Sequence, residues 1–284
     1  MKPRLLYAVY LVAVTAVWLY VQFPARTIQA YVVQKARLAA PELSVAVAAA
    51  DFRFPLGVRL ERVKLSHQGA PALDLEWLDL QPGWRILLPG QAEFGFTARL
   101  AAGRARGRVA LIREGRWMPR SLRLDLEAVQ VAAIPLLSRQ AGREITGACS
   151  SQVVYTPEEG SATVQAELVL ENGRVEIRQP MIRRRDLSFA RVDSRIEARG
   201  RAVALRRLTW QGTEIDGELS GHLEIKTPLE ASAIEIRGEL RPHPGFLAEL
   251  RQTIPERLMP KPGPGGRYAV QLTGTLARPQ YRLR

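Results

Sequence analysis

Two patterns of hydrophobic residues divide this chain. The run from Leu5 to Phe23, LLYAVYLVAVTAVWLYVQF, contains no charged residue. Most of the remaining chain alternates instead, as between Leu73 and Trp77, where acidic residues separate the apolar ones. At about 1.5 Å per residue, a helix over the first run nearly spans a hydrocarbon core of about 30 Å. The alternation predicts half-buried β-strands that carry one apolar face.

The apolar run indicates a membrane anchor. Lys2 and Arg4 precede it, and Trp18 and Tyr20 lie near its far end, where aromatic side chains favour the membrane interface. A cleaved secretory signal is the alternative, but such signals have a shorter apolar core and an Ala-x-Ala cleavage pattern. We therefore expect residues 1–23 to form a cytoplasmic tail and an uncleaved transmembrane signal anchor. In a bacterium this predicts a single-pass inner-membrane protein with the bulk of the chain in the periplasm.

The chain after the anchor is predicted to be mainly β. Helical spacing over residues 26–39, ended by a proline, predicts a helical linker over 24–50. Residues 51–284 form the predicted β-rich domain, with a division into two halves near residue 142. Two short helices are expected within this domain, over 132–141 and 245–254.

Turn-forming residues punctuate the alternating runs of the β-rich domain. Asn172-Gly173 stands between two such runs and is the strongest hairpin signal in the chain. Later strands are expected over 192–198, 203–210, 215–225, 234–240 and, last in the chain, 268–276.

The predicted strands outnumber the helices that could cover their apolar faces. An uncovered apolar face must fold on itself, close up or bind something apolar. Glycines such as Gly217 and Gly238 recur in the apolar rows and allow the sheet to curve. We therefore predict a curved antiparallel sheet that forms an open groove for acyl chains, with a self-packed core as the alternative. The predicted lining consists of apolar residues from several strands: Leu168, Leu170, Ile196, Leu205, Leu219, Leu223, Ile236 and Leu272.

Charge narrows the range of partners. The formal net charge is +13 and the sequence pI is about 10.6, a balance that in a cytosolic protein would indicate nucleic acid. The expected membrane anchor argues against nucleic acid and leaves an affinity for anionic surfaces such as phospholipid headgroups. Arg183, Arg184 and Arg185 form the densest basic cluster, which is either a solvated loop or a contact for headgroups or a partner protein.

Residues with catalytic or metal-binding potential are sparse. His67, His222 and His243 lie far apart in the sequence, and none has the spacing of a metal-ligand set. Cys149 is the only cysteine, and its place in an alternating run favours a small buried residue over a reactive thiol. The sequence has neither a nucleophile elbow nor a phosphate-binding loop. We therefore predict a non-enzymatic protein without catalytic residues, cofactor or metal.

Several short segments resemble a known family. The segment from Gly274 to Tyr281, GTLARPQY, is similar to the Gly-x-Leu-x-x-Pro ending of AsmA-like periplasmic proteins. The other segments that carry the resemblance are Phe23-Pro24, Pro55-Leu56-Gly57-Val58-Arg59-Leu60 and Asn172-Gly173-Arg174-Val175. Over nearly its whole length the chain resembles type II secretion system protein N, GspN, which belongs with the AsmA-like proteins. The resemblance implies an inner-membrane protein with a curved periplasmic sheet and an accessory role in type II secretion. It implies no catalytic residue.

Two functions follow from these expectations, and they are not exclusive. The first is an accessory component of type II secretion that acts in protein export through contacts with other secretion proteins in the periplasm. The second is an AsmA-like scaffold that binds phospholipid or another acyl-chain ligand, or transfers it between the inner and outer membranes.

Overall fold

The computed structural model describes most of the chain after residue 42. The described residues are 43–53, 57–114, 116–141, 143–158, 161–177, 186–227, 229–253 and 262–283, with positions 7, 10, 11, 14, 27, 29, 30, 33 and 34. Most of the predicted anchor over 5–23, most of the predicted helix over 26–39, and all of the cluster Arg183, Arg184 and Arg185 lie outside the described residues. Within the part that is described, no helix is long and apolar enough to cross a membrane.

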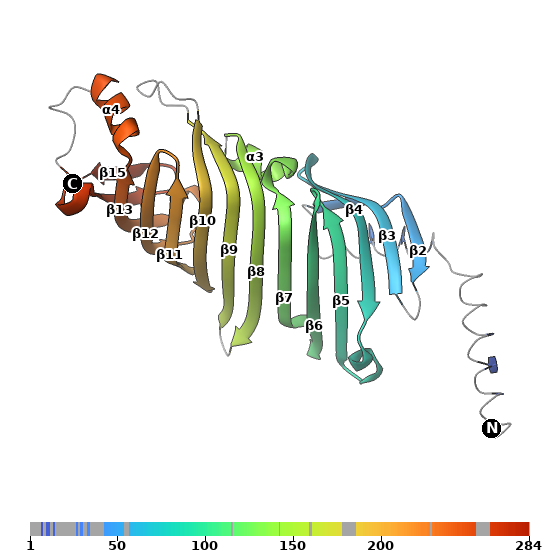
Figure 1. Cartoon of the computed structure of the whole chain (residues 1–284). Coiled ribbons are helices and arrows are strands. Elements are labelled where there is room, and N and C mark those ends of the chain that lie inside the picture. Colours follow the sequence, from blue (N-terminus) through green and yellow to red (C-terminus); the bar gives the residue numbers. More distant parts are fainter. Residues whose placement is uncertain are drawn as a thin grey trace.

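One antiparallel sheet of fifteen strands makes up most of the protein (Figure 1). From β3 to β15 each strand pairs with its neighbours in the sequence, while β1 and β2 both pair with β3 at one edge. The predicted mainly β fold with few helices is therefore confirmed. The strands are β1 (Leu43–Ala46), β2 (Ala49–Arg53), β3 (Gly57–His67), β4 (Ala70–Pro82), β5 (Gln91–Leu100), β6 (Gly103–Glu114), β7 (Arg116–Gln130), β8 (Ile145–Glu158), β9 (Ser161–Glu176), β10 (Asp186–Arg199), β11 (Ala202–Gly212), β12 (Ile215–Glu224), β13 (Ala233–Pro242), β14 (Tyr268–Thr275) and β15 (Pro279–Leu283).

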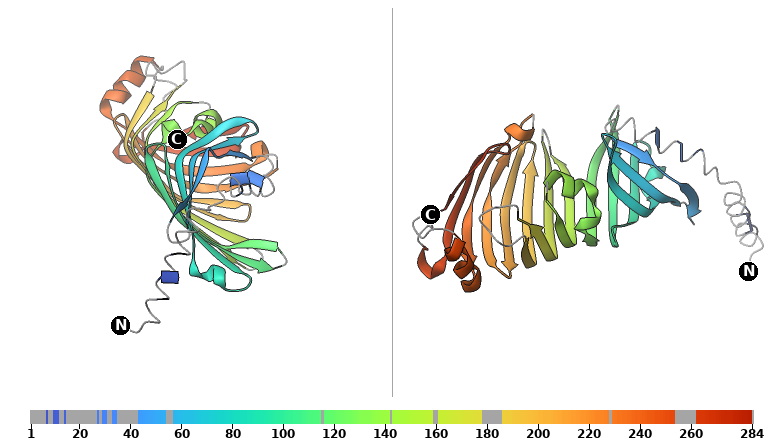
Figure 2. Two further views of the ribbon diagram at one scale, coloured as in Figure 1. Left: turned by 90° about the vertical axis from the view of Figure 1, so that its right-hand side faces the viewer. Right: turned by 90° about the horizontal axis from the view of Figure 1, so that it is seen from above.

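The sheet forms a long, twisted strip (Figure 2). The first strands lie at one end of the strip and the last strands at the other, because the order in the sheet follows the order in the sequence. β7 and β8 pair from Leu122 with Tyr155 to Gln130 with Ala148, so the sheet continues past residue 142. The division into two halves near that residue stays a prediction.

Short helices join strands at a few points. The two predicted helices are present as α3 (Pro135–Ala141) and α4 (Pro244–Thr253). Each begins with a proline, which suits the first helical position because no hydrogen-bonding N–H is needed there. Four 3₁₀ turns are also present: η1 (Trp84–Leu87), η2 (Val131–Ala133), η3 (Leu229–Ala231) and η5 (Pro264–Gly266).

The tightest packing lies in the first half of the strip. Ile134, just before α3, packs against one of two buried clusters, and Val33 packs against the other. The side-chain amide of Gln29 also donates a hydrogen bond to the carbonyl of Val47. The buried members of the two clusters are Val47, Ala50, Leu60 and Val63 in the first, and Ala98, Leu100, Ala105 and Val129 in the second.

The predicted hairpin at Asn172-Gly173 is wrong. β9 continues through both residues, and Asn172 has a φ of 51°, in the left-handed region. The pairing with β8 is interrupted here, since Arg174 lies opposite Thr146 while Glu171 lies opposite Ala148. Asn-Gly favours left-handed backbone both in hairpin turns and in β-bulges, so the same sequence signal fits either structure. In this chain it marks a bulge inside a long strand.

The sheet also begins earlier and ends later than the sequence pattern indicates. β1 and β2 occupy part of the predicted linker, where the strands LSVA and AADFR hold few large apolar residues. Near the end of β14, Gly274 has a φ of 102°, and the chain then turns between Thr275 and Arg278 and continues as β15. β15 begins at Pro279, and a proline at the start of an edge strand removes no essential ladder hydrogen bond.

Candidate functional site

The register of the sheet places the predicted lining residues on one face. Ile196 of β10 lies opposite Leu205 of β11, and Ile236 of β13 lies opposite Leu272 of β14. Gly221 of β12 pairs with both Leu205 and Ile236 and links these two pairs. Directly opposed residues of an antiparallel sheet project to the same side, so this row is continuous from β10 to β14.

A second row of the same face contains two more predicted residues. Leu168 connects through β10 to Leu208, which lies opposite Leu219. Leu170 is two residues from Leu168, and Leu223 is four residues from Leu219, so both share this side of their strands. All eight predicted residues therefore lie on one side of β9–β14, which we call the apolar face.

A β-bulge in β11 places one residue on the apolar face that the alternating sequence pattern does not predict there. Leu205 lies opposite Gly221 and Leu208 lies opposite Leu219, with a register shift between them. Arg206 and Arg207 occupy the bulge. Strict alternation would place Leu208 on the other side of the sheet, so it is missing from the predicted lining. The register corrects this omission.

The side of the sheet that carries the apolar face continues across β4–β8, and its two halves are covered differently. α3 packs against β4, and Ile134 adds to the buried cluster beneath it. Among the described elements, no helix packs comparably against β9–β12. All eight predicted residues are half-buried, and beyond residue 132 the buried hydrophobic residues of the described chain are Ile234, Phe246 and Tyr268. The apolar face of β9–β12 is thus less covered than that of the first strands.

Aromatic rings lie over glycines on this face. Phe96 pairs across the strands with Gly107, and Trp210 pairs with Gly217. A Cβ added at Gly107 would meet the Phe96 ring at 2.3 Å, and one added at Gly217 would meet the Trp210 ring at 2.2 Å. Each ring therefore occupies the place of its partner's side chain and keeps the face apolar where the glycine offers no side chain.

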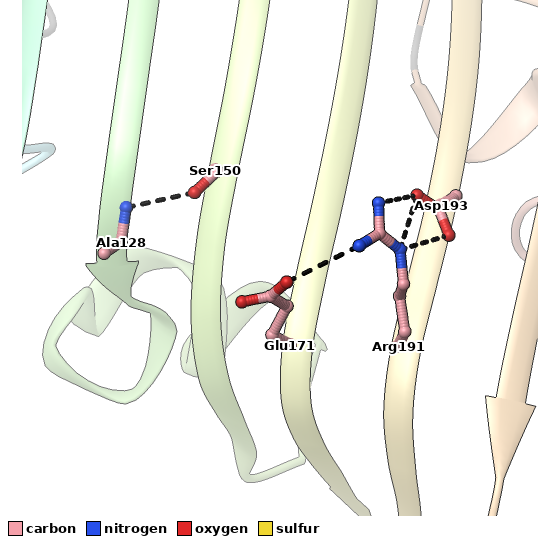
Figure 3. A network of polar contacts seen from close by, with 5 residues as sticks. All are labelled: Ala128, Ser150, Glu171, Arg191 and Asp193. Carbon is pink, nitrogen blue, oxygen red and sulfur yellow. Dashed lines mark hydrogen bonds and ion pairs between the residues drawn. The ribbon is translucent and has the colours of Figure 1, made fainter.

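The opposite face carries a network of ion pairs. Arg191 of β10 donates hydrogen bonds of 2.8 and 3.0 Å to Asp193 and lies 3.6 Å from Glu171 of β9 (Figure 3). The hydrogen bond raises the pKa of Arg191 and lowers that of Asp193. The same view shows the Ala128 N–H donating to Ser150 Oγ at 3.1 Å. Exposed ion pairs such as those of Arg191 contribute little stability, but their charged side chains keep this face hydrated. Neighbouring pairs on the same strands are Arg195–Glu167, Arg206–Glu197 and Arg207–Glu218.

The residues with chemical potential lie in separate places. His222 Nε2 is 3.3 Å from a carboxylate oxygen of Glu235, while His67 is a half-buried residue at the end of β3. Cys149 is half-buried in β8, and burial raises the pKa of its thiol, which lowers the fraction of reactive thiolate. Within the described ranges, no group of three or more potential ligand residues could hold a metal ion.

The contact between His243 and Asp216 joins the residue before α4 to β12. Their side chains approach to 3.0 Å, and Asp216 also accepts a 3.1 Å hydrogen bond from the Gly212 N–H. Hydrogen bonding between the two side chains raises the pKa of His243 and lowers the pKa of Asp216. Both shifts favour the charged pair, so the contact makes stability depend on pH.

We expect the difference in melting temperature between wild type and Asp216→Asn to depend on pH. The His243 contribution is complete below the ordinary pKa of 6.5 and is lost as pH rises through the raised folded value. The Asp216 contribution is present above the ordinary pKa of 3.8 and is lost as pH falls through the lowered folded value. The difference should therefore be largest near pH 5 and smaller at pH 9, as measured by circular dichroism melts. An unchanged difference would contradict an ionic role for this pair.

No protein-family model, curated protein or solved structure matches the chain. The resemblance to GspN and to AsmA-like proteins therefore stays a prediction from the quoted sequence segments. The closing segment has a definite role in this fold, because it forms the turn between β14 and β15. Gly274 adopts the left-handed region, and the N–H of Arg278 donates to the carbonyl of Thr275 at 3.1 Å.

Proposed function

We propose that this protein is a non-enzymatic scaffold, anchored in a bacterial inner membrane, whose apolar face holds acyl chains in the periplasm. The observation that supports the proposal is the alignment of eight half-buried apolar residues along β9–β14, without comparable helical cover over β9–β12. Burying one such side chain contributes roughly 1.5 to 3 kcal/mol, so an unoccupied face of this kind is unfavourable in water. Acyl chains would cover it without needing polar partners.

The contrast between the two sides of the same strands also supports this function. In β10 and β11, Ile196 and Leu205 project to the apolar face, whereas Arg195 and Arg206 belong to the ion-pair network. A sheet divided in this way separates acyl chains from water along its length. It offers a series of similar positions instead of one shaped pocket, which suits phospholipids that vary in their acyl chains.

We also propose that the scaffold serves as an accessory component of type II secretion, in contact with other secretion proteins. The closing segment from Gly274 to Tyr281 supports this role, since its Gly-x-Leu-x-x-Pro pattern resembles the AsmA-like ending and forms the last turn of the sheet. The secretion role and the lipid-holding role are compatible. Co-purification of the full chain from its membrane, with identification of the attached proteins, tests the secretion role separately.

Photo-crosslinking at adjacent residues tests the lipid-holding role directly. A benzophenone-bearing residue in place of Leu205 faces the apolar side, whereas the same residue in place of Ala204 faces the opposite side. We expect irradiation of cells that express the full chain to give a lipid adduct at position 205 and little or none at position 204, as detected by mass spectrometry. Equal labelling at both positions, or no lipid adduct at position 205, would contradict an acyl-chain site.

The Leu219→Glu substitution separates an open face from a closed core. On an open face, the charged side chain should leave the domain folded, with only a modest decrease in melting temperature, while it reduces the lipid adduct at position 205. In a closed core, the same change buries an unpaired charge and should unfold the domain. Ser220→Glu is the matched control, because Ser220 is the exposed neighbour on the other side of β12 and should alter neither measurement.

A further inference from the structure

Large hydrophobic side chains are exposed along one edge of the sheet, where β4 and β6 end and β5 and β7 begin. In the connection between β4 and β5, Trp84, Ile86 and Leu88 have exposed fractions of 68%, 45% and 39%. Trp117, near the start of β7, has an exposed fraction of 50%. Figure 1 shows that the β4–β5 connection projects beyond the ends of the strands. Contiguous exposed hydrophobic residues of this size are characteristic of contact sites.

The two connections that carry these residues are neighbours. The N–H of Arg113, at the end of β6, donates a 2.9 Å hydrogen bond to the carbonyl of Gly90, just before β5. Arg113 also lies opposite Trp117 in the register of β6 and β7. The four exposed side chains therefore belong to two adjacent hairpin tips. We call this set, Trp84, Ile86, Leu88 and Trp117, the tip patch.

The backbone of the larger tip is held in place while its side chains point outward. The Gly83 N–H donates to the carbonyl of Glu93 at 2.7 Å, and the Ile86 N–H donates to the carbonyl of Gly83 at 3.1 Å. The Leu88 N–H donates to the carbonyl of Arg85 at 3.0 Å and closes the turn. Because the turn is already ordered, a partner that buries these side chains would not have to order the backbone first.

The composition of the tip patch matches the surface of a bilayer. Tryptophan favours the boundary between headgroups and acyl chains, and aliphatic side chains favour the layer just beneath it. The Arg85 guanidinium lies 5.7 Å from the ring of Trp84 and pairs with Glu93 at 3.5 Å, and Arg113 is exposed next to Trp117 in the register. Arginines beside an apolar tip complement anionic headgroups. A narrow tip that projects from two hairpins can also insert into a soft surface without needing a complementary cavity.

We propose that the tip patch inserts into the interfacial layer of an anionic bilayer and holds this edge of the sheet against the membrane. The contact is separate from the acyl-chain role of the apolar face, because the tip residues belong to the β4–β5 connection and the start of β7, outside β9–β14. The tip contact also differs from the predicted anchor. The anchor limits how far the sheet lies from the membrane, whereas the tip contact fixes the orientation of the sheet as well.

Site-specific fluorescence tests this contact. An environment-sensitive dye is attached to Ile86→Cys in a Cys149→Ser background of the full chain, reconstituted with vesicles of phosphatidylethanolamine and phosphatidylglycerol. We expect a blue shift and strong quenching by lipids that carry a nitroxide near the top of the acyl chain. The same dye at Ser220→Cys, an exposed position in the middle of β12, should remain in an aqueous environment. Equal quenching at the two positions would overturn the proposal.

Two further measurements distinguish a membrane contact from a contact with protein. Replacing Trp84 and Trp117 with serine should reduce the quenching at position 86 several-fold without changing the melting temperature, because both side chains are exposed. A benzophenone-bearing residue in place of Ile86 that crosslinks in cells to protein and not to lipid would indicate a protein contact and would overturn the proposal. None of these readouts depends on the apolar face. The tests of the tip contact can therefore fail while the lipid adduct at position 205 is still found, and the adduct can be missing while the tip contact is confirmed.

Discussion

A Leu60→Ala variant is expected to be less stable than wild type by about 3 kcal/mol. Leu60 of β3 has an exposed fraction of 1% and belongs to the buried cluster with Val47, Ala50 and Val63. Truncation to alanine leaves a cavity inside this cluster. Partly buried hydrophobic residues already pack against the cluster, so they cannot move far enough to fill the cavity. Urea unfolding of the full chain, followed by circular dichroism, measures the loss.

Leu205→Ala is the matched comparison for this variant. Leu205 is half-buried on the apolar face of β11, where no described helix provides comparable cover. The same truncation should therefore lower the free energy of unfolding by only about 1 kcal/mol. Equal losses at the two positions would mean that the apolar face is packed as tightly as the first cluster, and would contradict the idea that it stays open for a ligand.

A Gly238→Ala variant is expected to lose roughly 3 kcal/mol of stability, at the upper end of the range for overpacked positions. A Cβ at Gly238 would lie 1.9 Å from the carbonyl oxygen of Glu218 and 2.8 Å from the Cα of Leu219. Both are backbone atoms of β12, so the two strands must move apart to admit a single methyl group. A thermal melt of the purified full chain should show a clear decrease in melting temperature.

Gly245→Ala is the control for this prediction. Gly245 lies in the first turn of α4, and a Cβ added there would have no neighbour within 4 Å. Alanine favours the helix slightly more than glycine does, so the variant should be as stable as wild type or more stable by up to about 1 kcal/mol. A similar decrease for both glycines would contradict the close approach of β12 and β13.

Sequence reasoning predicted the class of the fold because the apolar period of two persists through most of the strands. It also placed the two short helices, whose proline starts and apolar spacing are local signals. It missed the turn between β5 and β6, where Ala101 and Ala102 have φ values of 47° and 61°. Such values normally favour asparagine or glycine, so the residues of this turn give no turn signal. The register of the sheet, rather than local preference, holds these alanines in the left-handed region.

The residues of the apolar face were largely predictable from the sequence, but the packing of other elements over that side of the sheet was not. Alternation within each strand assigns the eight lining residues to one side, and antiparallel pairing then brings those sides together. Cover depends on where α3 and Ile134 pack, which is a property of the assembled sheet that no local pattern encodes. The tip patch was missed for a related reason. The residues Trp84, Ile86 and Leu88 lie between two Pro-Gly pairs, and sequence alone does not reveal whether such a connection packs inward or projects.

The strand order of the sheet has a consequence for how the protein is made. From β3 onward every strand pairs with its neighbours in the sequence, so no strand needs a pairing partner from a distant part of the chain. A chain that emerges with its amino end first, from a ribosome or a translocation channel, can add one hairpin at a time to a growing edge. Each addition closes only a short loop, which keeps the entropy loss of each step small. Synthesis or export and the growth of the sheet can therefore proceed together, strand by strand.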